Sequence, residues 1–209
     1  NDDIERAIES LTTRLGTNVD LPGALSAVVS LAARSPSDAA ELVERDACRL
    51  AVSAILRSRV NAGGGGARPL QRWKVQGTAC IALAALARGA RPEQEVPLRI
   101  VREGGAPAVA EVMGDHPRNR KLQRNGCAAL GGIAGGIEHG TVRDALRDAD
   151  AHGLIAAAMA QHSGDTGVVA AALHAAAQMC GGGGAHARSA ALELVAAGFA
   201  KEGHAALAE

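Results

Sequence analysis

The strongest constraint on the fold is a stretch of sequence that recurs along the chain. The segment KVQGTACIALAALA (residues 74–87) aligns with KLQRNGCAALGGIA (residues 121–134) at an offset of 47, with identity at six of fourteen positions. A third copy lies at residues 167–180, at an offset of 46, and a weaker one at residues 20–33. Periods of about 20 to 50 residues are typical of repeat architectures, so we expect stacked structural units.

The segments between these copies also share a layout. Each contains a short charged helix, a break, and a second helix with apolar residues at helical spacing. The predicted breaks are Gly-Gly (104–105), Ala-His-Gly (151–153) and, near the end of the chain, Ala-Gly (197–198). Each unit is therefore predicted to hold a short, a medium and a long helix. The apolar residues expected on two of the medium helices are Leu50, Ile55 and Leu56, and then Val109, Val112 and Met113.

Composition supports an all-α fold. Alanine and glycine together make up about a third of the 209 residues, whereas Trp73 and Phe199 are the only aromatic residues. A large β-sandwich or barrel normally uses aromatic and β-branched residues, so that class is excluded. Alanine suits closely packed helices, and glycine suits the ends of helices. We expect Leu83, Leu86, Leu130 and Ile133 to fill the layers between units, and Cys80 and Cys127 to be small buried hydrophobes.

The run EGGAPAVAEVMGDHPRNRKLQRNGCAALGGIAGG (residues 103–136) resembles the armadillo repeat, with HEAT repeats as the nearest alternative. The resemblance implies an all-α, right-handed α-solenoid of about four three-helix repeats. We expect one solenoid over residues 1–209, excerpted from a longer chain. Its predicted divisions are a partial repeat at 1–36, repeats at about 37–90, 91–138 and 139–184, and a partial repeat at 185–209.

No motif predicts catalysis, a cofactor or a metal ion. The glycine-rich stretches 61–69 and 181–184 lack the Gly-Lys-Ser/Thr ending of a phosphate-binding loop and are expected to be surface loops. The seven histidines include no His-Glu-x-x-His pattern. The four cysteines show neither a disulfide framework nor zinc-ligand spacing, which favours a reducing location, the cytoplasm, with an organelle matrix as the alternative. We therefore expect a non-catalytic protein without cofactors.

The resemblance implies that the third helix of each repeat lines a concave groove, with two positions per repeat forming ladders along it. In nuclear-import receptors of this family the first position is Trp and the second is Asn, and together they hold basic peptides. The equivalent pairs here contain neither residue, which argues against binding of basic localisation peptides. The pairs are Ile81/Ala85, Ala128/Gly132, His174/Gln178 and Ser26/Ser30.

Charge is unevenly distributed although its sum is zero. The balances are −2 over residues 1–67, +6 over 68–124 and −4 over 125–209. We interpret the middle cations as a basic patch for an acidic peptide; the alternative is that they are ordinary solvated residues at helix starts. These cations are Arg72, Lys74, Arg118, Arg120, Lys121 and Arg124. Trp73 is predicted to be buried at the base of the glycine-rich insertion, with an exposed binding anchor as the alternative.

Together these patterns predict a protein-interaction scaffold, or a structural subunit of a hetero-complex. Its partner is expected to be a protein or peptide, acidic if the patch is functional; neutral charge and scarce aromatics argue against nucleic acid, and no apolar run is long enough for membrane insertion. The alternative that the resemblance implies is a regulatory or substrate-recruiting solenoid of a larger enzyme such as a ubiquitin ligase. The candidate partner-binding residues are Arg72, Trp73, Lys74, Thr78, Arg120, Lys121, Arg124, Asn125, His174 and Gln178.

Overall fold

The computed structural model describes residues 2–17, 20–60, 69–89, 92–136 and 138–181, and a few single residues between 188 and 195. Over these ranges the secondary structure consists of eleven α-helices and one short 3-10 helix, with no strand. The prediction of an all-α fold is therefore confirmed.

The helices follow the predicted order of short, medium and long. A pair of helices opens the chain, α1 (Asp2–Thr17) and α2 (Leu21–Arg34), and three groups of three helices follow. The first group is α3 (Pro36–Glu44), α4 (Ala47–Val60) and α5 (Pro69–Gly89). The second is α6 (Val96–Arg102), α7 (Gly105–Asp115) and α8 (Arg120–Ala134), preceded by the 3-10 turn Pro92–Gln94. The third is α9 (Gly140–Asp148), α10 (Ala151–Gln161) and α11 (Thr166–Met179).

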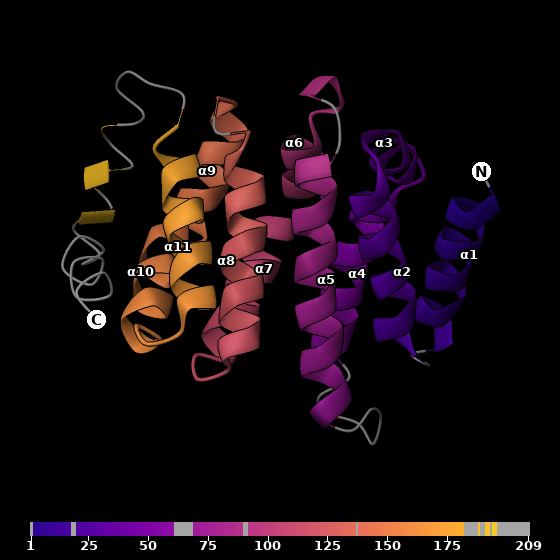
Figure 1. Cartoon of the computed structure of the whole chain (residues 1–209), viewed down its shortest axis with the longest axis horizontal. Coiled ribbons are helices and arrows are strands. Elements are labelled where there is room, and N and C mark those ends of the chain that lie inside the picture. The colour runs from indigo at the N-terminus through magenta and orange to yellow at the C-terminus, as the bar shows by residue number, and fades with distance from the viewer. Residues whose placement is uncertain are drawn as a thin grey trace.

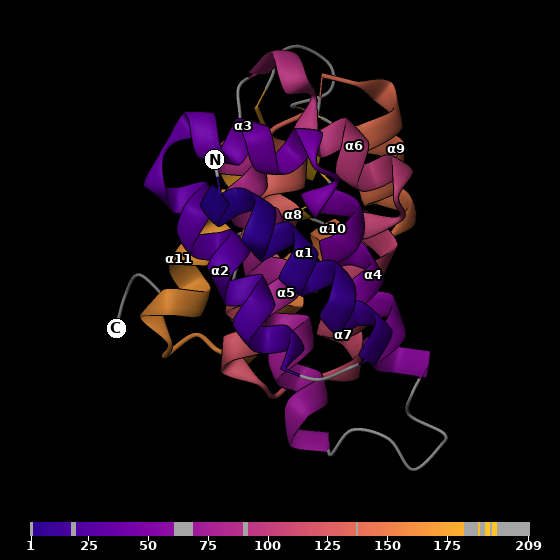
Figure 2. The same cartoon turned by 90° about the vertical axis from the view of Figure 1, so that its right-hand side faces the viewer.

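The groups stack into a solenoid in which equivalent helices lie next to one another. The third helices α2, α5, α8 and α11 form one layer and run in the same direction (Figure 1). Helices α1, α4, α7 and α10 form the layer behind it, and the short helices α3, α6 and α9 lie along one edge (Figure 2). Each helix of the front layer therefore packs mainly against its equivalents in neighbouring groups.

The starts of two third helices, α8 and α11, are set by side-chain caps. The side chain of Asn119 accepts a hydrogen bond from the Leu122 amide at 3.3 Å at the start of α8. At the equivalent position of α11, the Asp165 carboxylate accepts from the amides of Gly167 and Val168 at 3.0 and 3.1 Å. The corresponding residue of α5 is Arg72, which lies inside the helix because α5 begins earlier. Helix α5 thus has about one additional turn at its start.

The first and second helices of each group are joined at a residue with left-handed backbone. These residues are Asp46, Gly104 and Asp150, with φ of 63°, 78° and 51°. The predicted break at Gly-Gly (104–105) is confirmed. The predicted break at Ala-His-Gly (151–153) is wrong, because those residues lie inside α10 and the chain turns just before them. Aspartate tolerates the left-handed region, so the break does not need a glycine there.

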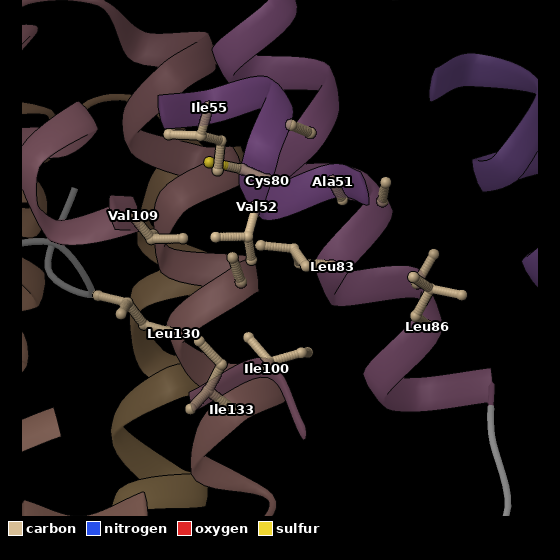
Figure 3. Packing of buried hydrophobic residues seen from close by; sticks show 14 of the residues in the cluster. Ala51, Val52, Ile55, Cys80, Leu83, Leu86, Ile100, Val109, Leu130 and Ile133 are labelled. Atoms are coloured by element: carbon tan, nitrogen blue, oxygen red, sulfur yellow. The ribbon is translucent and has the colours of Figure 1, made fainter. Parts of the chain in front are cut away.

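The core is continuous across the groups. Leu83 and Leu86 of α5 and Leu130 and Ile133 of α8 are all fully buried, as predicted. Leu83, Leu130 and Val109 of α7 lie in one region, and Leu86 lies further along α5 (Figure 3). Ile100 of α6 and Val52 of α4 close the same region, and Cys80 and Cys127 are buried in it. Leu56 lies on α4 as expected, but it is 43% exposed and so does not share the core with Leu50 and Ile55.

Two glycines bring the third helices unusually close together. A Cβ atom at Gly131 would lie 3.0 Å from the Ala175 Cα of α11, and one at Gly132 would lie 3.0 Å from the Ala87 Cβ of α5. Both distances are shorter than ordinary carbon contacts of about 3.5–4.0 Å. The absence of side chains on both sides of α8 therefore sets the spacing of the front layer.

Candidate partner-binding surface

The outward side of α2, α5, α8 and α11, which we call the third-helix face, is shallow in its centre. Of the predicted ladder positions, Ala85 and Gly132 are buried between helices, and Ile81 and Ala128 are half-buried. The outer helices differ from this, because Ser26, Ser30 and His174 are exposed and Gln178 is half-buried. The centre of the face thus offers small residues, and its two flanks offer polar side chains.

The start of α5 and α8 is the basic end of this face. Lys74, Lys121 and Arg124 are exposed there. Arg72 differs from them, because its side chain is half-buried and its Nε donates a hydrogen bond to the Ser58 carbonyl of α4 at 3.0 Å. Arg72 was predicted to belong to the basic patch, but this hydrogen bond connects it to α4 instead.

An open hollow of about 680 Å³ lies beside these cations, and we call it the Trp73 hollow. It brings together three predicted residues, Trp73, Arg120 and Lys121, with the turn between α7 and α8. Trp73 is half-buried and packs against the hydrophobic core while lining the hollow. Trp73 is thus neither fully buried nor fully exposed, and each of the two alternatives describes one side of its ring. Residues 61–68 of the glycine-rich insertion, whose base Trp73 was expected to close, lie outside the described residues. The full lining is Trp73, Asp115, His116, Pro117, Arg118, Asn119, Arg120 and Lys121.

The turn that forms one wall of the hollow is held from three directions. Gln123 of α8 donates from Nε2 to the carbonyls of Met113 and His116, at 2.8 and 3.1 Å. The His116 ring is hydrogen-bonded through Nε2 to Gln76 Oε1 of α5 at 3.0 Å. The Pro117 carbonyl accepts a hydrogen bond from His162 Nε2, at the end of α10, at 2.8 Å. The wall is therefore fixed to both neighbouring groups.

The hollow carries net positive charge. Arg118, Arg120 and Lys121 line it together with one carboxylate, Asp115. That carboxylate is already paired, because Arg59 Nε of α4 lies 3.3 Å from Asp115 Oδ2. Arg120 lies 3.6 Å from Asp165 but remains largely exposed.

Two of the candidate residues have structural roles. Asn125 is buried, and its Nδ2 donates to the Gly77 carbonyl at 3.0 Å, joining α8 to α5. Thr78 donates from Oγ1 to the Lys74 carbonyl within α5, at 2.8 Å. His116 and Pro117 were not predicted as site residues, although a His-Pro pair two residues before the cap Asn119 is a turn signal that points to this wall.

A smaller hollow of about 290 Å³ lies at the opposite end of α2 and α5, lined in part by Ala85, Arg88 and Gly89. Arg34 also lines it, but hydrogen bonds from its guanidinium to Asp38 and Asp3 hold the Arg34 pKa above its ordinary value. Since this hollow has no aromatic residue and its Arg34 is engaged, it is less suited to capture a ligand than the Trp73 hollow.

The described residues show no other chemical centre. No three His, Cys, Asp or Glu side chains within them come together as a metal-binding group. Burial raises the pKa of the Cys48, Cys80 and Cys127 thiols to about 12, and also raises the pKa of Cys180, so these thiols are poor nucleophiles. Among the helices described, none combines the length and the apolarity that a membrane span requires.

Comparison with known structures identifies the class of fold. A designed armadillo repeat protein in complex with the peptide (KR)4 matches 97% of this chain over 77% of its own length, with a TM-score of 0.69 and 18% identity. Computationally designed armadillo repeat proteins for modular peptide recognition match 90% of this chain over 69% of theirs (TM-score 0.66, 18% identity). An engineered protein from a structural genomics consortium matches 97% over 72% (TM-score 0.70, 20% identity).

The chain therefore has the armadillo-repeat fold, as its sequence predicted. No known protein family matches the sequence, and no curated protein matches it. The likeness to the designed proteins concerns the fold, an α-solenoid scaffold.

Proposed function

We propose that this chain is a non-catalytic interaction scaffold or structural subunit that binds a protein or peptide partner across the third-helix face. One observation carries the proposal: four parallel helices pack side by side in a single layer, whose flanks present exposed polar side chains at Ser26, Ser30 and His174. The tight contacts at Gly131 and Gly132 fix the spacing of that layer. A fixed spacing lets a partner make regular contacts without first ordering the surface.

The designed proteins with this fold support the proposal by analogy. One was solved with a (KR)4 peptide, and others were designed for modular peptide recognition. The present face differs because exposed Lys74, Lys121 and Arg124 occupy the start of its central helices. Like charges repel, so we propose that the partner is not a basic peptide. We also propose a cytoplasmic location, consistent with the four free cysteines.

A matched pair of substitutions tests the proposal. Ala170 of α11 is exposed on the third-helix face, and Ala157 of α10 is exposed on the layer behind it. Ala170→Glu places a bulky charge on the proposed surface, whereas Ala157→Glu makes the same change elsewhere. Partners are measured by affinity purification with quantitative mass spectrometry, and Ser30→Glu on α2 serves as a second face variant.

We expect a partner that is lost with Ala170→Glu and Ser30→Glu but retained with Ala157→Glu. Equal capture by all three variants would refute the face as the binding surface. Circular dichroism of each variant checks that the helices remain folded, which we expect because all three positions are exposed.

A further inference from the structure

We propose that the Trp73 hollow binds an acidic linear segment of the partner that carries an apolar side chain beside its carboxylates. This inference rests on the proposed function and names the chemistry of the partner at one end of the same face. Four properties of the hollow support it: charge, an aromatic surface, rigidity and size.

The charge of the hollow favours carboxylates. Arg118 and Lys121 are both exposed, and neither forms an ion pair with any residue in the described ranges. The one carboxylate of the lining, Asp115, pairs with Arg59, which it shares with Glu111, and the three cations of the lining still outnumber it. Arginine and lysine in this arrangement have unused donors for acidic side chains, and arginine binds carboxylates in a bidentate manner.

Trp73 supplies the apolar part of the hollow. Its ring is half-buried and packed against the core, so it presents a fixed aromatic surface to the hollow. By the repeat alignment, Trp73 occupies in α5 the position that Arg120 occupies in α8, directly after the additional turn of α5. A tryptophan next to arginines is typical of the residues that dominate binding energy at interfaces. An apolar side chain of the ligand is therefore expected to lie on this ring.

The hollow is formed before any ligand arrives. Gln76, Gln123 and His162 hold the turn between α7 and α8 through hydrogen bonds of 2.8 to 3.1 Å. A preordered wall lowers the entropic cost of binding. Its volume of about 680 Å³ lies within the range of about 300–1,000 Å³ that is usual for ligand pockets.

The surrounding charges favour a compact acidic segment over a long polyanion. Asp20 at the start of α2 pairs with Arg14, and Asp165 at the start of α11 lies 3.6 Å from Arg120, on either side of the positive region. A nucleic acid that followed the edge of the layer would meet an ion pair at each side instead of further free cations, and it would find a single tryptophan where single-strand binders use several stacked aromatics. A peptide confined to the starts of α5 and α8 avoids both.

Trp73 also makes the test direct, because it is the only tryptophan in the sequence. The full 209-residue chain is titrated with a synthetic peptide in which glutamates flank a pair of leucines, and Trp73 emission is recorded. A matched peptide with glutamines in place of the glutamates tests whether binding needs the negative charge. The (KR)4 peptide tests whether a positively charged peptide binds as well. We expect a saturable change in emission with the glutamate peptide only. Raising the salt from about 0.1 M to about 1 M shortens the Debye length from roughly 10 Å to roughly 3 Å and should weaken the binding.

Charge reversal identifies the residues. Lys121→Glu and Arg118→Glu are expected to weaken binding of the glutamate peptide by about tenfold or more. Arg102→Glu, at the exposed end of α6, makes the same change outside the hollow and should have little effect. A peptide with lysines in place of the glutamates should bind Lys121→Glu better than it binds the unaltered chain. Urea unfolding of each variant verifies that stability is retained, since all three positions are exposed.

Several results would overturn the inference. The glutamate peptide could bind without changing Trp73 emission, or the glutamine peptide could bind as tightly as the glutamate peptide. Lys121→Glu and Arg102→Glu could weaken binding of the glutamate peptide equally. A single-stranded oligonucleotide could compete with the glutamate peptide and bind more tightly than it does. Failure here is separable from failure of the proposed function. If Ala170→Glu abolishes partner capture while the glutamate peptide does not bind, the third-helix face remains the binding surface and only the assignment of the hollow is lost.

Discussion

Replacing Leu130 by alanine tests the stacking of the repeats most directly. Leu130 is fully buried in α8, among residues from both neighbouring groups of helices. The substitution removes three carbons, each contributing about 0.8 kcal/mol on burial, which gives roughly 2.4 kcal/mol. The cavity left behind raises the expected loss to roughly 2–5 kcal/mol. For a chain of this length, such a loss lowers the melting temperature by roughly 5–20 °C.

The matched control is Leu56→Ala. Leu56 lies on α4 and is 43% exposed, so the same change of residue in a helix should cost about 1 kcal/mol or less. Both variants have nearly the same change in helix propensity, and the difference between them therefore measures burial.

Urea unfolding followed by circular dichroism and by Trp73 fluorescence provides the measurement. Stacked repeats need not unfold in one step, so the two curves must coincide before free energies are compared. If Leu130→Ala cost no more than Leu56→Ala, the core between the first and second groups would not hold the solenoid together, and the stacking argument would be refuted.

Four further predictions concern a buried hydrogen bond, the cysteines and the surface charge. Asn125→Ala should lower the free energy of unfolding by about 1 kcal/mol, measured by urea unfolding, because it removes the hydrogen bond between α8 and α5. Cys180 is half-buried and should react with a thiol reagent before Cys48, Cys80 and Cys127, which should react only after unfolding. Burial raises the pKa of those three thiols from 9.0 to about 12. Their contribution to the free energy of unfolding should therefore be constant below pH 9 and fall as the pH rises toward 12. Urea unfolding that shows no loss of stability between pH 9 and 12 would contradict this. The (KR)4 peptide should not bind, and calorimetry that detects binding would remove the charge argument for the third-helix face.

The helices and the core could be predicted from the sequence because they depend on local spacing. Identities at Lys, Gln and Cys positions matched the third helices to one another, and leucines at helical spacing marked the buried side. Leu56 shows the limit of that reasoning. It fits the helical spacing of the core residues, but its exposure depends on which neighbouring helix covers that side of α4, and spacing alone does not contain this information.

The Trp73 hollow could be predicted only in part. Its cations were visible as a local excess of charge, and Trp73 was visible as the only tryptophan. Their meeting depends on the packing of α5 beside the turn between α7 and α8, and these segments are separated by more than forty residues in sequence. Asn125 was predicted to bind a partner because it is polar. The close approach of α8 to α5 places it in the interior instead, where it bonds to the Gly77 carbonyl.

The parallel direction of the third helices has an electrostatic consequence. Each helix carries about half a positive elementary charge at its first turn, and parallel alignment collects these partial charges at one edge of the layer. At α2 and α11 a carboxylate at the cap, Asp20 or Asp165, offsets the macrodipole. At α8 the cap is the uncharged Asn119, and the first turn contains no acidic residue. The backbone of α8 thus adds to the positive potential of its own side chains, and replacing Asn119 by aspartate would cancel part of this potential while keeping a good cap.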